Sequence, residues 1–408
     1  MPTRTLSDKL AILADAAKYD ASCASSGGER RNSRDGQGLG SSGGAGICHA
    51  YAPDGRCISL LKILMTNFCI YDCAYCVNRV SSHVERARFS VEEVVKLTVE
   101  FYRRNYIEGL FLSSGIIRSP DDTMADMVRI VRTLREQENF RGYVHLKTIP
   151  DASPELLDEA GRWADRLSIN VELPTKAGLA QFAPEKDPQQ IRKTMADVRL
   201  RREASREKTY RGKRKARFAP AGQSTQLIVG ADGADDRTIL HQSSQLYANY
   251  QLSRVYYSAF SPIPDASSAL PLIKPPLKRE HRLYQADWLL RFYGFAADEI
   301  AGQGMLDLDV DPKTAWALVH REAFPVDVNR ASKEQLLRVP GFGTKSVGRI
   351  LAARRDRRLR YEDLVAIGAV MKNARPFITA EGWSPRGLLD ADNLRARFAP
   401  APEQLSLI

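Results

Sequence analysis

Apolar positions along the first two thirds of the chain alternate between continuous runs and runs with helical spacing. Continuous runs of this length predict buried strands, and helical spacing predicts amphipathic helices. The expected strands are 57–67, 109–115, 143–150, 167–174, 225–230 and 255–260. The expected helices are 7–20, 91–104, 124–138, 154–163 with Ser153 as N-cap, and a long charged helix from about Pro188. This alternation predicts an α/β domain with a parallel sheet, closed or partly closed.

The composition changes on both sides of this alternating region. A Gly/Ser-rich stretch from Ser25 to Gly46 cannot bury much apolar surface, so we expect a mobile loop there. A Pro-rich connector at 271–276 precedes helical segments such as 281–293. The expected domains are an N-terminal helix and loop at 1–47, an α/β barrel at 48–270, the connector with its helices at 271–325, an all-α domain at 326–380 and a tail at 381–408.

Composition narrows the class of protein. With 408 residues and 43% hydrophobic content, the chain is long enough for two or three globular domains. Its start lacks the apolar core of a signal peptide, and no run is long enough to cross a bilayer. Six cysteines, three of them clustered, fit a reducing compartment better than a disulfide framework. We therefore expect a cytoplasmic protein with no membrane partner.

The net charge of +11 favours an anionic partner. Much of it lies between Arg199 and Arg217, where ten Lys or Arg residues face only Glu203 and Glu207. Such a segment, inserted between two barrel strands, would serve as a clamp on a nucleic-acid backbone. A solvated face with helically spaced ion pairs is the alternative.

Three cysteines stand close together in the run Cys69-Ile-Tyr-Asp-Cys73-Ala-Tyr-Cys76, and no fourth follows at ligand spacing. Thiolates hold iron-sulfur clusters, and a four-iron cluster tied down at three irons leaves one iron open to another ligand. The spacing therefore predicts a cluster that performs chemistry. Two other interpretations stay open, namely a zinc site completed by His83 and cysteines that are merely buried.

The C-x3-C-x2-C spacing resembles the signature of the radical S-adenosylmethionine (radical SAM) enzymes. The resemblance implies a partial (βα)6 barrel, which suits the six expected strands. It also implies that Cys69, Cys73 and Cys76 hold a [4Fe-4S] cluster, and that S-adenosyl-L-methionine (SAM) is cleaved there to a 5′-deoxyadenosyl radical. In this family the radical abstracts hydrogen from the substrate, while the protein supplies position and excludes solvent.

The resemblance further implies where SAM would be held. Tyr75 matches the aromatic residue that lies against the adenine in such enzymes, or else it packs the loop. Ser113-Ser114-Gly115 stands where two glycines and an acid are usual, so only backbone and hydroxyl contacts are implied. Asn170 and Glu172 lie where a ribose-binding group would be, and Gly230 ends the strand beside the adenine. A salt-bridged Glu172 and a purely structural Gly230 are the alternatives.

The roles of other polar residues in the barrel region are not decided by the sequence. Lys147 stands among apolar residues of an expected strand, where it could face SAM or the substrate, or pair with Glu172. Cys23, Cys48 and Cys57 could ligate a second cluster, or donate hydrogen to a substrate radical. Their irregular spacing favours ordinary reduced cysteines.

Residues 326–351 read as a helix, a Pro340-Gly-Phe-Gly turn and a second helix. This arrangement closely resembles the helix-hairpin-helix DNA-binding motif. In that motif the turn presents backbone N–H groups that bind phosphate oxygens without reading sequence. The candidate nucleic-acid-binding residues are Gly341, Gly343, Lys345 and Arg349.

The residues that follow extend this likeness. A basic stretch occupies 354–360, and 361–375 resemble a degenerate second copy with Gly368 in its turn. Tandem copies often pack as one four-helix unit. A hairpin retained only for packing or protein contacts is the alternative.

A radical SAM barrel joined to a helix-hairpin-helix resembles, over nearly the whole chain, a family of radical SAM proteins described as acting in DNA modification or repair. We therefore expect an enzyme that acts by radical chemistry on DNA and needs a reductant protein as a partner. Damaged or single-stranded DNA would be the easier substrate, because a paired base must leave the stack to reach a barrel interior. The alternatives are an enzyme that modifies an RNA such as tRNA, and a non-catalytic DNA-binding protein whose cluster senses redox state.

Overall fold

The computed structural model describes residues 4–17, 47–51, 57–207 and 217–399. They form two compact units. The N-terminal unit takes in the chain to Ala234 together with Gln245–Pro275, and the C-terminal unit takes in Asp235–Ser244 and the chain from Pro276. The loop expected between Ser25 and Gly46 lies outside the described residues.

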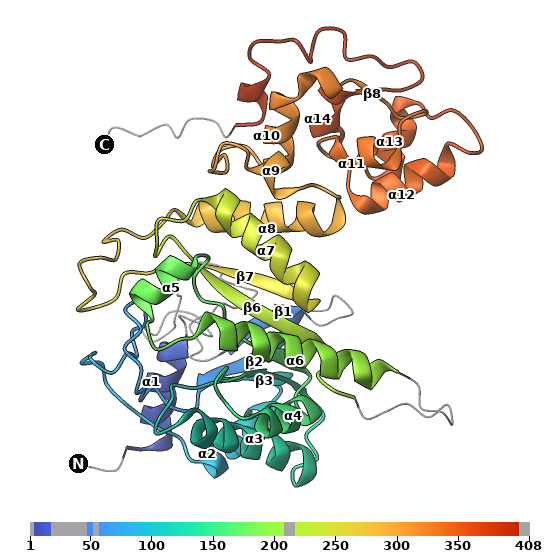
Figure 1. The fold of residues 1–408 in the computed structure, drawn as a ribbon. Coiled ribbons are helices and arrows are strands. Elements are labelled where there is room, and N and C mark those ends of the chain that lie inside the picture. The colour runs from blue at the N-terminus through green and yellow to red at the C-terminus, as the bar shows by residue number, and fades with distance from the viewer. Residues whose placement is uncertain (1–3, 18–46, 52–56, 208–216, 400–408) are drawn as a thin grey trace, which may run out of the picture. The chain divides into compact units, whose positions relative to one another are not determined.

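A curled seven-stranded sheet forms the centre of the N-terminal unit (Figure 1). Its strands follow one another in chain order, with β2 to β7 all parallel and β1 antiparallel to β2 at one edge. The strands are β1 (Ile47–Tyr51), β2 (Cys57–Leu64), β3 (Gly109–Ser113), β4 (Tyr143–Lys147), β5 (Arg166–Ser168), β6 (Gly222–Val229) and β7 (Arg254–Ala259). Six parallel strands in chain order confirm the expected α/β half-barrel.

Helices α2 to α7 lie in the connections between the parallel strands, α1 packs against β2, and α2, α3 and α4 pack side by side on the sheet (Figure 1). They are α1 (Leu6–Ala16), α2 (Val91–Arg103), α3 (Pro120–Glu136), α4 (Pro154–Trp163), α5 (Lys176–Phe182), α6 (Pro188–Arg206) and α7 (Asp236–Tyr250). Side-chain capping hydrogen bonds mark where several of these helices begin. The hydroxyls of Ser90 and Ser119 accept backbone N–H groups at the first turns of α2 and α3.

Four details differ from the expected elements. Helix α1 ends at Ala16 rather than at residue 20, and α3 begins at Pro120 rather than at 124. Ser153 occupies the N-cap position of α4, but its side chain makes no capping hydrogen bond. Strand β5 is only three residues long, and beyond it the chain pairs with β6 again only at the bridge between Glu172 and Leu227.

The register of the sheet decides where the loops meet. Leu64, Ser113 and Lys147 are the last residues of neighbouring parallel strands, and Ser168 ends the next one. The carboxyl ends of parallel strands lie at one edge, so the loops after β2, β3, β4 and β5 gather there. The cysteine run is the loop that follows β2.

The C-terminal unit is mostly helical around an aromatic core that includes Trp316, Phe324, Phe342 and Phe377. A short parallel pair, β8 (Val326–Asp327) and β9 (Ile378–Thr379), joins the segment before the two hairpins to the segment after them. Its helices are α8 (Leu277–Phe292), α9 (Ala297–Ile300), α10 (Pro312–Val319), α11 (Lys333–Arg338), α12 (Thr344–Ala353), α13 (Tyr361–Ile367) and α14 (Met371–Ala374), with short 3-10 turns at Arg321–Ala323, Arg375–Phe377 and Arg395–Arg397. Within the described part of the chain, no helix of either unit has the length and apolarity that crossing a membrane requires.

Two helical hairpins in the C-terminal unit lie against each other. The turn between α11 and α12 contains Gly341, and the turn between α13 and α14 contains Gly368, with φ values of 82° and 88°. The Val370 N–H donates to the Gly341 carbonyl at 3.0 Å, and the Val370 carbonyl lies where a Cβ on Gly341 would stand. Glycine at 341 is therefore required by this close approach of the two turns.

Candidate active site

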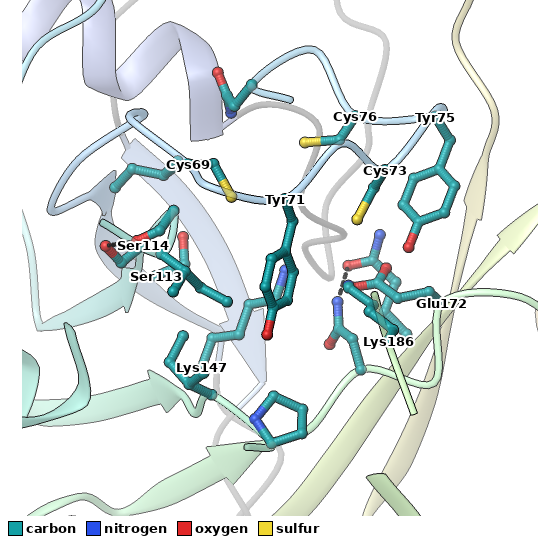
Figure 2. Close-up of a pocket in the computed structure, with 18 of the residues that line it drawn as sticks. Cys69, Tyr71, Cys73, Tyr75, Cys76, Ser113, Ser114, Lys147, Glu172 and Lys186 are labelled. Carbon is teal, nitrogen blue, oxygen red and sulfur yellow. Dashed lines mark hydrogen bonds and ion pairs between the residues drawn. The ribbon is translucent and has the colours of Figure 1, made fainter. Parts of the chain in front are cut away.

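A cavity of about 180 Å³ lies at the carboxyl edge of the parallel sheet (Figure 2). The strands contribute Leu64, Ser113, Lys147, Gln226 and Ile228 to its lining. The loops add most of the rest, including all three clustered cysteines. The elements that the parallel register brings together therefore build one site.

The three cysteines share this cavity, and Figure 2 shows their sulfur atoms turned toward a common space. Burial raises the pKa of Cys73 to about 12, against the opposing effect of the Lys186 ammonium, and burial also raises the pKa of Cys76. A bound metal reverses this preference, because thiolates are its ligands. Among the described residues, no three His, Cys, Asp or Glu side chains converge to hold a single metal ion. A four-iron cluster instead takes each thiolate on a separate iron, so this donor set fits such a cluster.

Hydrogen bonds at its base close the cysteine loop. The Thr66 hydroxyl donates to the Ala87 carbonyl at 2.9 Å. The Asn67 amide donates to the Glu85 carbonyl at 2.7 Å and accepts the Ala87 N–H at 2.8 Å. The two ends of the segment from Asn67 to Glu85 are thus clasped together without any metal.

Arg86 holds the same loop from within. Its guanidinium donates to the carbonyls of Asn67, Asn78, Arg79 and Ser82, the last three at 2.8, 2.6 and 2.9 Å. A planar group with five N–H donors suits several carbonyls at fixed positions. Arg86 could not be identified from the sequence, since nothing in its spacing distinguishes it from the many other arginines.

Tyr75, between the second and third cysteines, packs at the edge of an apolar cluster that includes Leu173, Phe182 and Ile228. The Ala74 N–H donates to the Phe182 carbonyl at 2.7 Å and fixes this contact. The Tyr75 hydroxyl lines the cavity and is buried with no hydrogen-bond partner within the described structure. A buried hydroxyl of this kind favours a polar ligand in the cavity.

Ser113, Ser114 and Gly115 line the wall opposite. The Ile70 N–H donates to the Ile116 carbonyl at 2.8 Å, and the Gly115 N–H donates to the Thr66 carbonyl at 2.8 Å. A Cβ at Gly115 would lie 2.2 Å from the Phe68 carbonyl oxygen. Glycine is needed here because the cysteine loop rests directly on this backbone.

A buried ion pair crosses the floor of the cavity. The Lys186 ammonium lies 2.8 Å from Glu172 and 5.9 Å from the centre of the Tyr75 ring. Burial alone would lower the pKa of Lys186, but the Glu172 carboxylate raises it well above its usual range. Lys147, the other partner considered for Glu172, lines the same cavity from the end of β4.

Further polar residues complete the lining. The Asn170 amide donates to Gln226 at 3.3 Å, and the Tyr71 hydroxyl donates to Asp151 at 3.0 Å. Tyr71, Asp151, Lys186 and Gln226 were not identified from the sequence. Only the order of the strands, which places their loops together, could have indicated them.

Several residues considered from the sequence lie elsewhere. Gly230 does not line the cavity; its φ of 79° serves the turn after β6. His83, which the zinc interpretation needs, is exposed and lies outside the cavity lining. Cys48 on β1 and Cys57 at the start of β2 are also absent from that lining, and β2 begins at the end remote from the cysteine loop. Cys23 lies outside the described residues.

The predicted nucleic-acid contacts belong to the C-terminal unit. The Gly343 N–H donates to the Ser346 hydroxyl at 2.8 Å, and the Arg349 guanidinium donates to the Ile367 carbonyl at 2.8 Å. Lys345 is exposed in the first turn of α12. Beneath the turn, the buried Lys313 ammonium donates to the Phe342 carbonyl at 2.6 Å.

The described start of the basic run, on α6, is largely engaged within the N-terminal unit. Arg199 pairs with Glu203 at 2.8 Å and also donates to the Asn249 carbonyl. Arg201 pairs with Asp158, and Arg202 is buried. Residues 208–216, which carry half of the basic side chains of this run, lie outside the described residues.

Residues 63–211 match the family model of the radical SAM superfamily. No protein of curated function matches the chain. Among solved structures, HydG, a maturase of the [FeFe]-hydrogenase, shares 14% identity with a TM-score of 0.43, over 56% of this chain and 48% of its own. Methylornithine synthase (PylB) shares 12% identity with a TM-score of 0.45, over 56% and 61%.

A third structure, coproporphyrinogen III oxidase (HemN) from Escherichia coli, shares 14% identity with a TM-score of 0.36, over 56% of this chain and 51% of its own. The chain thus spans about half the length of HydG and HemN, and no functional conclusion follows from these three structures. The family match covers the cysteine loop and most of the cavity lining. The chain therefore carries a radical SAM domain, the catalytic domain of a superfamily of enzymes, over residues 63–211.

Proposed function

We propose that the chain is a radical SAM enzyme that acts on DNA, in repair or modification. The observation that carries the enzymatic part is the convergence of Cys69, Cys73 and Cys76 on one cavity lined by unsatisfied and charged groups. These thiolates would hold a [4Fe-4S] cluster. When bound, the cluster supplies the electron that cleaves SAM to methionine and a 5′-deoxyadenosyl radical.

The lining residues offer complementary groups to the amino-acid end of SAM. Lys186 presents a cation and Glu172 an anion 2.8 Å apart, which suits a zwitterion with a carboxylate and an ammonium group. Ser114 and the backbone of Gly115 lie on the opposite wall. Glu172 would thus offer the SAM ammonium group the carboxylate that the turn at 113–115 lacks.

Other residues orient the adenosine end and exclude water. The free hydroxyl of Tyr75 offers a hydrogen bond, and Asn170 lies nearby in the lining. Aliphatic side chains, including Ile116, Ile149 and Ile228, cover the remaining wall. An apolar wall protects a reactive radical from solvent.

The DNA part of the proposal is supported by the C-terminal unit. Its two helical hairpins pack turn to turn through Gly341 and Val370. Residues 344–360 carry seven Lys or Arg side chains against the single carboxylate of Asp356. Contacts of this type to phosphates give affinity without sequence preference.

Anaerobic reconstitution with iron and sulfide, followed by reduction in the presence of SAM, tests the enzymatic part. We expect release of 5′-deoxyadenosine, loss of that release in Cys73→Ala, and retention in Cys57→Ser, whose cysteine is exposed and remote from the cavity. Absence of release from the fully reconstituted protein would leave only a redox-sensing or structural cluster. A reductant protein would replace the chemical reductant in the cell.

Binding to labelled duplex DNA, single-stranded DNA and tRNA at one fixed salt concentration tests the substrate. We expect DNA to bind more tightly than tRNA, and Gly341→Val to weaken DNA binding, because its side chain would collide with the Val370 carbonyl. Preference for tRNA would favour an RNA-modifying enzyme. A screen of damaged and modified oligonucleotides for mass changes that need both SAM and reductant would then identify the reaction.

A further inference from the structure

Two aromatic rings lie exposed on α8 of the C-terminal unit. The exposed fractions of Trp288 and Phe292 are 51% and 44%, and their ring centres lie 4.4 Å apart at an angle of 51°. The other large hydrophobic side chains exposed in the described part of this unit are aliphatic. A contacting pair of exposed rings is a different kind of surface, because it presents aromatic faces to a ligand.

Tyr293, the residue after Phe292, links this aromatic pair to the first hairpin. Its hydroxyl lies 3.8 Å from the place where a Cβ on Gly343 would stand. The Lys313 ammonium lies 4.7 Å from the centre of the Tyr293 ring. The residue next to Phe292 therefore lies against the turn that would contact phosphates.

A cation lies beside the rings and another lies at the turn. The Arg291 guanidinium lies 4.8 Å from the centre of the Phe292 ring, with Asp287 as its ion-pair partner at 3.5 Å. Lys345 is exposed two residues past Gly343, in the first turn of α12. Proteins that bind single-stranded nucleic acid combine aromatic rings, on which bases stack, with cations that contact the phosphate backbone.

We propose that Trp288 and Phe292 form a stacking surface for unpaired bases, next to the hairpin that contacts the phosphates of the same strand. The inference rests on the proposed action on DNA and narrows its substrate class to single-stranded or locally unpaired DNA. A continuous duplex hides its base faces, so only an unpaired base could lie on these rings. A protein partner would match the apolar rings, but it would need an acidic surface to match the cations around them.

The test is fluorescence anisotropy of the intact protein with a labelled oligothymidylate and with a duplex of equal length. We expect Trp288→Ala and Phe292→Ala each to weaken single-strand binding about tenfold or more, with duplex affinity changed less than about twofold. Trp288→Leu keeps an apolar side chain but removes the ring, so it should also weaken the binding. Val319→Ala, at a position whose side chain is 68% exposed in the same unit, is the matched control.

A second measurement covers the case in which a variant folds poorly. Trp288 is the most exposed tryptophan of the described residues, so single-stranded DNA should quench a wild-type emission that Trp288→Phe lacks. Unchanged affinity for single-stranded DNA in all ring variants, or wild-type affinity for it in Trp288→Leu, would overturn the stacking surface. If these variants and the wild type still bound duplex DNA, the proposed function would stand. Failure of the wild type to bind either DNA would overturn both. A change of oligomeric state in Trp288→Ala with unchanged DNA affinity would identify a protein contact and overturn the proposal.

Discussion

Replacing Arg86 with alanine should loosen the cysteine loop and release the cluster. The guanidinium donates to four carbonyls between Asn67 and Ser82 and so ties together the segment that carries all three cysteines. A hydrogen bond from a charged donor contributes roughly 1.5–3 kcal/mol, and taking the lower figure as the limit for each bond gives about 6 kcal/mol for all four. The side chain is half-buried, and freed carbonyls can bond to water. About half of that limit, ~3 kcal/mol, is therefore the expected loss for the ordered loop.

That loss corresponds to a factor of roughly 100 in the equilibrium constant between the ordered and the disordered loop. The assay is the rate at which a chelator removes iron from the anaerobically reconstituted protein, with total iron and sulfide as the starting reference. Arg88→Ala is the matched control, because Arg88 is two residues away and pairs with Asp126 on α3 instead. Equal rates of iron loss from the wild type, Arg86→Ala and Arg88→Ala would refute the reasoning. Arg86→Lys should fall between them, since an ammonium cannot reproduce the planar donor geometry.

Three further changes test the cavity and the C-terminal unit. Gly115→Ala places a methyl group 2.2 Å from the Phe68 carbonyl oxygen, so SAM binding in equilibrium dialysis should fall at least tenfold, whereas Gly348→Ala meets no neighbour within 4 Å and should retain it. Lys186→Met leaves the buried Glu172 without its cation, so urea denaturation should show a loss of about 3 kcal/mol, partly recovered by adding Glu172→Gln; undiminished stability in the single variant would contradict the role of the pair. Burial lowers the pKa of Lys313 to about 7, against an opposing effect of Asp311. Above pH 7 the amine of Lys313 is therefore neutral in the folded protein, whereas in the unfolded chain it keeps its proton to about pH 10. The unfolding free energy should therefore rise with pH across that window by about 1.4 kcal/mol per pH unit, and the same slope in Lys313→Met would assign it to another group.

The arrangement of the strands was predictable because its signals are local. The apolar runs at 57–67 and 109–115 are long enough to indicate buried strands, and caps such as Ser90 define where helices begin. Strand β1 was missed because its five residues form a strand only through antiparallel pairing with β2. The expected strand at 167–174 was too long because the regular pairing with β6 ends at Ser168 and resumes only as a single bridge at Glu172, whose φ of 68° is left-handed.

The candidate site was predictable where the family resemblance supplies a motif. The three cysteines, Tyr75 and the turn at 113–115 do line one cavity. Lys186 could not be identified in this way, because its pairing with Glu172 depends on how α5 and its flanking loops return to the barrel edge. Gly230 is absent from the cavity lining, and its positive φ shows that a glycine at a strand end can serve backbone geometry, the alternative left open by the sequence.

The clasp that Thr66 and Asn67 make with Glu85 and Ala87 bears on how the enzyme would mature. Its hydrogen bonds join protein to protein, so the chain can set the positions of the three thiols before any iron arrives. Cluster insertion is then expected to be a ligand exchange onto a folded acceptor, unlike the coupled folding of small zinc domains. Loss of an oxidised cluster would then be expected to leave the barrel folded and able to take up a new one.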